Sequence, residues 1–99
     1  MQKIDLESIK NYWCYEDIKK NHNNINIKEL KDRVRVNIYD KYGVNATFYI
    51  KQYNYNFDSF SISGFNVFNK DRNITEELEY TDSINDCIKG VLYYFNTRY

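Results

Sequence analysis

Two stretches in the middle of the chain alternate apolar and polar residues with a period of two. Successive side chains of a β-strand point to opposite faces, so this pattern predicts two half-buried strands, over residues 33–39 and 46–53. Between them, Asp40-Lys41-Tyr42-Gly43 supplies a turn, with glycine where a positive φ is least costly. The pattern therefore predicts a β-hairpin. The side chains expected on its apolar face are Val34, Val36, Ile38, Ala46, Phe48 and Ile50.

A third alternating run covers residues 59–63, after a turn at residues 54–58. Phe60 and Ile62 are expected to face the core, and the serines around them the solvent. Gly64 then shifts the phase of the pattern, which predicts a bulge or bend. The residues expected to return to the core side after it are Phe65 and Val67.

The N-terminal segment has helical spacing. Asp5 can cap a helix over residues 6–19, in which Leu6, Ile9 and Trp13 follow one another at helical intervals. An Asn-rich loop, residues 21–24, is expected to end it.

Residues 27–31 have two interpretations. Asn26 with Glu29 three residues later has the form of a capping box, which favours one helical turn. A continuous strand is the rival interpretation.

The C-terminal segment gives the clearest helix, with Thr81 or Asp82 as its cap. Residues 74–80 before it fit either a short fourth strand or an irregular acidic segment. The predicted fold is a single α+β domain, residues 1–99, in two layers: a three- to four-stranded antiparallel meander flanked by an N-terminal and a C-terminal helix. The apolar face of the last helix is expected to carry Ile84, Cys87, Ile88, Val91, Leu92 and Phe95.

Charge and hydropathy exclude several classes of protein. Lys plus Arg number 14 and Asp plus Glu number 14, a formal net charge of +0, whereas generic polyanion-binding proteins are strongly basic. The longest apolar run, residues 91–95, is too short to cross a membrane, and the N-terminus has no apolar segment typical of a secretion signal. We therefore expect a cytoplasmic protein without a membrane partner. Cys14 and Cys87 lack the paired spacing of a zinc site and are expected to be reduced and buried.

The sequence offers no recognisable catalytic apparatus. The single histidine, His22, lies in the Asn-rich loop, and no serine or cysteine stands in a nucleophile motif. The three glycines, at positions 43, 64 and 90, are too far apart to form a phosphate-binding loop. We therefore expect no enzymatic activity, no cofactor and no metal site.

The polar face of the predicted sheet is one candidate binding surface. Interleaved basic and aromatic side chains on a sheet can stack bases and neutralise phosphates, and a surface rich in Tyr and Ser also suits protein recognition. The third interpretation is that Tyr and Thr simply favour exposed strand positions. The candidate residues are Arg33, Arg35, Tyr39, Tyr49 and Tyr53.

An acidic run is the second candidate. No basic residue lies between Arg72 and Lys89. Such a patch could dock on the basic groove of a nucleic-acid-binding protein, and the alternative is a solvated acidic face. The acids are Glu76, Glu77, Glu79, Asp82 and Asp86.

The order helix, meander, helix is similar to that of double-stranded RNA-binding domains, which place lysines at the start of their last helix. The matching positions here carry no base and two acids: Asp82, Ser83, Asn85 and Asp86. With the strands between Val34 and Ser63 and the acids from Glu76 to Asp86, the chain resembles the small phage-encoded anti-CRISPR proteins. This resemblance implies a non-enzymatic protein that binds a CRISPR effector and blocks its nucleic-acid channel.

The expected function is thus a protein-binding inhibitor of a host nucleic-acid-handling system, encoded by a phage or mobile element, with a host protein as partner. A small nucleic-acid-binding domain that uses the Tyr/Arg sheet face, or a structural subunit, is the alternative.

Overall fold

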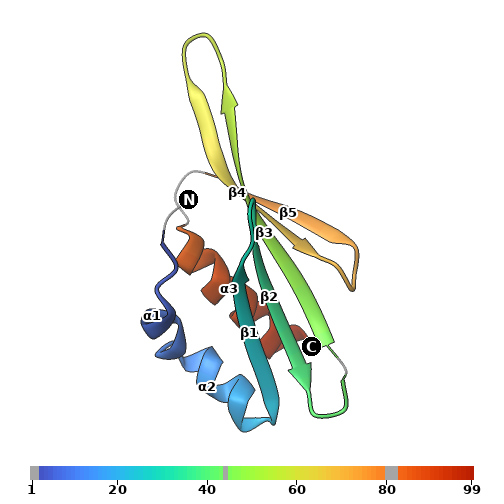
Figure 1. Ribbon diagram of the computed structural model, residues 1–99. Coiled ribbons are helices and arrows are strands. Elements are labelled where there is room, and N and C mark those ends of the chain that lie inside the picture. Colours follow the sequence, from blue (N-terminus) through green and yellow to red (C-terminus); the bar gives the residue numbers. More distant parts are fainter. Residues whose placement is uncertain (1–2, 44, 80–82) are drawn as a thin grey trace.

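A five-stranded antiparallel sheet with strand order β1-β2-β3-β4-β5 forms one layer of the molecule. The computed structural model describes residues 3–43, 45–79 and 83–99. Its helices pack on one face of the sheet (Figure 1), so the predicted two-layer α+β domain is confirmed, with five strands rather than three to four. The elements are α1 (Leu6–Lys10), α2 (Trp13–Lys20), β1 (Asn23–Glu29), β2 (Val34–Asp40), β3 (Asn45–Asn56), β4 (Ser61–Asn69), β5 (Ile74–Glu79) and α3 (Ile84–Arg98).

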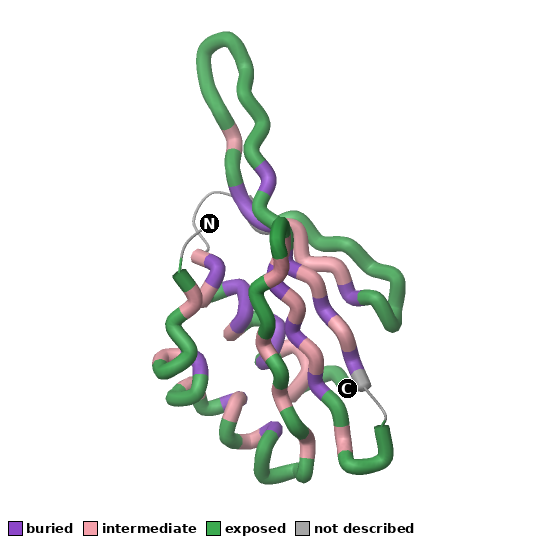
Figure 2. The backbone as a smooth tube through the Cα atoms, viewed as in Figure 1, coloured by how far each residue is buried: buried purple, intermediate pink, exposed green. Residues whose placement is uncertain are grey.

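The core lies between the helices and the face of the sheet that they cover. Buried positions alternate with more exposed ones along β2 and the first half of β3, as the period-two pattern predicts (Figure 2). The predicted hairpin forms, with Val34 opposite Ile50 and Ile38 opposite Ala46. The buried core is made of Ile9, Cys14, Ile18, Val34, Val36, Ile38, Ala46, Phe48, Ile50, Phe65, Ile84, Cys87, Ile88, Val91 and Leu92.

The predicted helix over residues 6–19 is in fact two helices, α1 and α2. Asp5 does cap the first, accepting a hydrogen bond from the Ser8 amide at 3.1 Å. The chain then breaks at Tyr12, whose ψ of 135° is extended. Ile9 and Cys14 are both fully buried, yet on one continuous helix they would point roughly 140° apart. The break brings both to the core, whereas Leu6 and Trp13, which share the helical spacing with Ile9, are exposed at 46% and 52%.

The predicted helical turn at residues 27–31 is wrong, and the strand interpretation is correct. The alternation of Ile25 and Ile27 with asparagines places two apolar side chains on the core side, opposite Ile38 and Val36. Because β1 pairs with β2 along its whole length, sheet pairing overrides the local capping signal. The strand begins at Asn23, inside the predicted loop, after a turn in which His22 has a φ of 65°.

The predicted bulge at Gly64 is also wrong. β3 pairs with β4 from Phe48–Asn69 to Asn56–Ser61 without a skipped residue. Ser61 and Ser63 therefore share a face with Phe65, while Ile62 lies on the opposite one. The turn lies at residues 57–60 rather than 54–58, and Phe60 is exposed at 57% instead of buried.

Segment 74–79 forms β5, which pairs with β4 from Gly64–Glu79 to Asn69–Ile74. The helix α3 buries the predicted face, with Phe95 packed at its margin. Its cap is Ser83, whose hydroxyl accepts from the Asp86 amide at 3.1 Å, whereas Thr81 and Asp82 lie outside the described residues. Cys14 and Cys87 are free and buried, as predicted.

Candidate functional site

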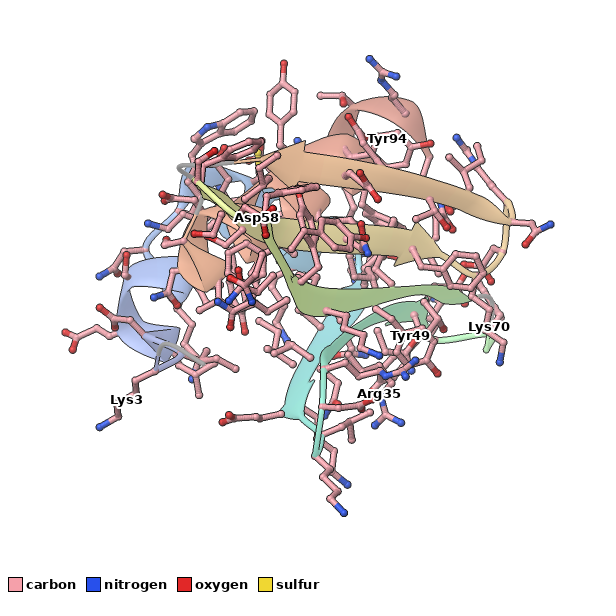
Figure 3. The ribbon with its side chains drawn as sticks, turned by 90° about the horizontal axis from the view of Figure 1, so that it is seen from above. Lys3, Arg35, Tyr49, Asp58, Lys70 and Tyr94 are labelled. Carbon is pink, nitrogen blue, oxygen red and sulfur yellow. The ribbon has the colours of Figure 1, made fainter. Side chains whose placement is uncertain are left out.

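The outer face, the side of the sheet opposite the helices, carries a row of basic and aromatic side chains. Lys28 pairs with Arg35, Arg35 with Tyr49, and Tyr49 with Phe68. Directly opposite residues in antiparallel strands present their side chains to the same face at close range. Figure 3 shows Arg35 and Tyr49 near each other, on the side of the molecule away from α1.

A second group of charges lies beside this row. Arg33 donates from Nε to Asp32 at 3.1 Å, and its guanidinium carbon lies 5.8 Å from the centre of the Tyr49 ring. Lys51 Nζ is 3.7 Å from the same carboxylate. The hydrogen bond from Arg33 lowers the pKa of Asp32, so the carboxylate stays charged beside both cations, and Arg33 also lies over the Tyr49 ring.

Two polar atoms of the outer face are buried and have no hydrogen-bond partner among the described residues: Arg35 Nε and Asn66 Oδ1. Arg35 is on β2, opposite Tyr49, and Asn66 is on β4, opposite Lys51, so β3 lies between them and they are offset along it by two positions. A buried polar atom without a partner costs about 1–3 kcal/mol. Each atom has less than 1 Å² of accessible surface, so an external partner meets the rest of these two side chains rather than the atoms themselves.

The five sheet residues predicted as a binding surface all lie on the outer face or at its margin, but not at one place. Arg33, Arg35 and Tyr49 are gathered around β3. Tyr39 is at the far end of β2, opposite Asn24, and is exposed at 38%. Tyr53 stands opposite Gly64 and is only 8% exposed, so it contributes little accessible surface.

The acidic run does not form one patch among the described residues. Val67 pairs with Glu76 and Asn66 with Glu77, so neighbouring acids of β5 point to opposite faces of the sheet. Glu76 and Asp86 line a groove on the helix side, and Glu77 lies on the outer face. The side chain of Glu79 and all of Asp82 lie outside the described part of the chain. The single acidic surface expected from the sequence is therefore divided by the pleat of β5.

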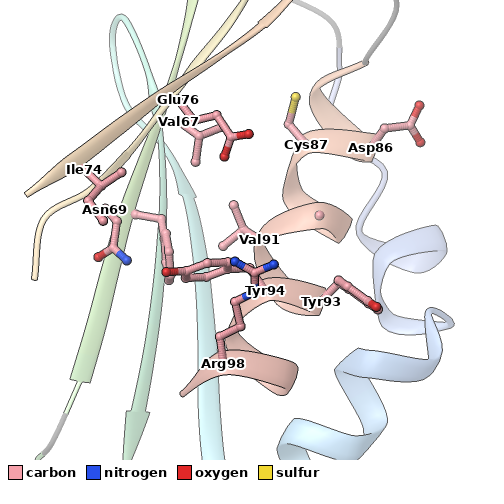
Figure 4. Close-up of a pocket in the computed structure, with 12 residues that line it drawn as sticks. Val67, Asn69, Ile74, Glu76, Asp86, Cys87, Val91, Tyr93, Tyr94 and Arg98 are labelled. Atoms are coloured by element: carbon pink, nitrogen blue, oxygen red, sulfur yellow. The ribbon is translucent and has the colours of Figure 1, made fainter. Parts of the chain in front are cut away.

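The groove lies between α3 and the β4–β5 hairpin and has a volume of about 460 Å³. In Figure 4, Ile74 and Glu76 of β5 face Val91 and Tyr94 of α3 across it. Gly90 lies on its helix side, and a Cβ added there would meet no atom within 4 Å. The groove is thus an apolar hollow with carboxylates at its margin.

Sequence reasoning missed Lys28, Asn66 and Phe68. Lys28 was hidden by the helical interpretation of residues 27–31, although the alternation from Asn24 to Lys28 carries the strand signal. Asn66 and Phe68 were hidden by the expected bulge, because an uninterrupted register from Ser61 places them on the outer face. The groove depends on how α3 packs and has no signal in the sequence.

No protein-family model, curated protein or solved structure matches the chain. The described residues hold no group of three or more His, Cys, Asp or Glu side chains that could bind a metal ion. In the same part of the chain, no helix combines the length and apolar character needed to cross a membrane.

Proposed function

We propose that this chain is a non-enzymatic domain that binds a host protein through the outer face of β2, β3 and β4. The proposed consequence of binding is inhibition of a nucleic-acid-handling system such as a CRISPR effector, in keeping with a phage or mobile-element origin. The observation that carries the proposal is the row of basic and aromatic side chains on this face, in which Arg35 stands opposite Tyr49 and Tyr49 opposite Phe68.

The aromatic side chains of this row favour a protein as partner. The Tyr49 and Phe68 rings, which stand opposite each other, supply apolar area with few rotatable bonds, as aromatic anchors of protein interfaces do.

The charge on the outer face sets the character of the partner's surface. Among the side chains that the structure describes on this face, four bases outnumber two acids: Lys28, Arg33, Arg35 and Lys51 against Asp32 and Glu77. Complementary potentials steer association, so the partner surface is acidic or rich in carbonyl groups. The acids of the run lie on two sides of the sheet. We therefore place the proposed contact on this basic and aromatic face rather than on the acidic run.

Single-stranded nucleic acid is the second candidate, because Tyr49 and Phe68 could stack bases while Arg33, Arg35 and Lys51 approach phosphates. The formal net charge of +0 counts against it.

The test compares two variants that remove one positive charge each, Arg35→Gln on the outer face and Lys10→Gln on exposed α1. Wild type and both variants are used as bait in lysate of the host, with and without nuclease treatment, and captured proteins are quantified by mass spectrometry. A partner kept by Lys10→Gln and lost by Arg35→Gln at least ~tenfold supports the proposal. The same variant must lose inhibition of that partner's activity. Capture that is equal for both variants contradicts the proposed surface, and capture abolished by nuclease favours nucleic acid.

A further inference from the structure

The groove between α3 and the β4–β5 hairpin has no part in the proposed function, and its size suits a small ligand. Its volume of about 460 Å³ falls within the roughly 300–1,000 Å³ of small-molecule sites. Buried Val91 and half-buried Val67 lie on its two walls, and Gly90 leaves space open on the helix side. Small-molecule sites combine such apolar walls with a few polar groups that orient the ligand.

Two opposite charges line this groove and come from different elements. The Glu76 side chain points from β5 toward α3, and Arg98 lies at the C-terminal end of α3 (Figure 4). Among the described residues neither forms an ion pair, since both ion pairs found there involve Asp32. Asp86 also lines the groove, but its carboxylate points away from Glu76 in Figure 4. The groove thus offers an acceptor for a cation at Glu76 and donors for an anion at Arg98.

The positive end of the groove is held by contacts within the protein. The guanidinium carbons of Arg98 and Arg72 lie 5.5 Å and 5.6 Å from the centre of the Tyr94 ring. Arg72 also donates hydrogen bonds to the Tyr94 hydroxyl at 2.8 Å and to the Arg98 carbonyl oxygen at 3.0 Å. These contacts fix the end of α3 before any ligand binds, which lowers the entropy cost of binding.

The length of the groove suits a short ligand. Its lining residues on α3 run from Asp86 to Arg98, a rise of roughly 18 Å at 1.5 Å per residue. An extended peptide spans at most about 3.3–3.6 Å per residue, so two or three residues cover roughly 7–11 Å and fit within this length. A peptide of this size carries an ammonium group at one end and a carboxylate at the other, which matches the two charges of the groove.

We propose that this groove binds a free, short apolar peptide in its zwitterionic form, with the ammonium group at Glu76, the carboxylate at Arg98 and an apolar side chain over Val91. Charge-assisted hydrogen bonds of this kind are roughly twice as strong as neutral ones. A chain terminus of a protein brings one of the two charges, whereas a free peptide carries both, so the charges favour the free molecule. Binding here is independent of the outer face, which lies on the other side of the sheet.

Three tripeptides test the two charges on the wild-type protein. The probes are alanyl-leucyl-alanine with free ends, its N-acetylated form and its C-terminal amide. In NMR titrations of the ¹⁵N-labelled protein, the free peptide should shift the amide signals of Glu76 and Val91 with a dissociation constant of ~10 μM–1 mM. Each blocked peptide should bind at least ~tenfold more weakly. No shift at ~10 mM free peptide, or equal binding of all three probes, overturns the proposal.

Variants that remove one charge assign each end of the ligand. Glu76→Gln should weaken binding of the free peptide at least ~tenfold and leave binding of the acetylated peptide unchanged, because that probe has no ammonium group. Arg98→Gln should likewise weaken the free peptide and leave the amide unchanged. Glu77→Gln, which removes the same charge from the outer face, is the control and should bind like the wild type. If Glu76→Gln binds the free peptide as well as Glu77→Gln does, the proposal is overturned.

A variant that fills the groove tests the position of the ligand. Gly90→Leu adds a side chain where an added Cβ meets nothing within 4 Å, and leucine favours a helix more than glycine does. This variant should fold, as judged by circular dichroism, and bind the free peptide at least ~tenfold more weakly. Unchanged binding by the folded variant overturns the proposal. If the variant fails to fold, the three probes on the wild type still decide.

Discussion

Glu76 and Glu77 are neighbours in sequence but lie on opposite sides of the sheet. Glu76 stands beside Val67 and lines the groove under α3, and Glu77 stands beside Asn66 on the outer face. A run of acids on a strand therefore acts on two surfaces, and each acid must be tested separately.

The first prediction uses this separation. Because basic side chains predominate on the outer face, Glu77→Gln should raise the association rate with the partner by ~2- to 3-fold at low salt. Glu76→Gln, which removes the same charge on the other side, should leave the rate unchanged. Biolayer interferometry at two salt concentrations measures both rates. Equal changes in the association rate for both variants would show that the charge of the outer face does not determine this rate.

The second prediction concerns the core. Leu92 is fully buried on α3, so Leu92→Ala should lower the free energy of unfolding by about 2–5 kcal/mol. Urea denaturation followed by circular dichroism gives this value. A loss below ~1 kcal/mol would mean that α3 does not pack on the sheet as described.

The third prediction has the opposite sign on the same helix. Gly90 is inside α3, where glycine costs about 0.5–1 kcal/mol relative to alanine, and an added Cβ would meet nothing within 4 Å. Gly90→Ala should therefore raise the free energy of unfolding by roughly that amount. Destabilisation in the same urea measurement would place another group against this position.

The fourth prediction concerns alkaline pH. Burial raises the pKa of the Cys14 thiol above its ordinary value of 9.0, and burial likewise raises the pKa of the Tyr12 phenol. A group whose pKa is higher in the folded state contributes stability that is present below the unfolded value and is lost as pH rises through the folded one. Stability should therefore fall as pH rises above 9.0.

Thermal melts between about pH 8 and 10.5 measure this loss. Cys14→Ala should start less stable at pH 8, since it leaves a small cavity, but should lose less stability as pH rises. If the stability of wild type and variant falls in parallel as pH rises, the Cys14 thiol does not cause the loss of stability.

The sequence predicted best where side-chain period and packing agree. The β2–β3 hairpin and the buried face of α3 follow directly from their periods of two and 3.6. It failed at Tyr12 and at Gly64, where local signals and tertiary packing disagree. Helical spacing continues through Tyr12, but both Ile9 and Cys14 can be buried only if the helix breaks there. A glycine after serines suggests a bulge, but the register of β4 is set by its unbroken pairing with β3.

The candidate site was predicted in part for the same reason. Alternation placed Arg35 and Tyr49 on one face, and their pairing confirms that they are neighbours. The buried state of Arg35 Nε and Asn66 Oδ1 depends on three strands meeting side by side, which no local pattern contains.

The central claim, that the outer face is the binding surface, is tested most directly by NMR titration of the ¹⁵N-labelled protein with its captured partner. The account predicts that amide signals of Arg35, Tyr49, Asn66 and Phe68 shift or broaden first, while those of α1 and α2 stay in place. Changes confined to α1, α2 or the groove beside Gly90 would contradict it.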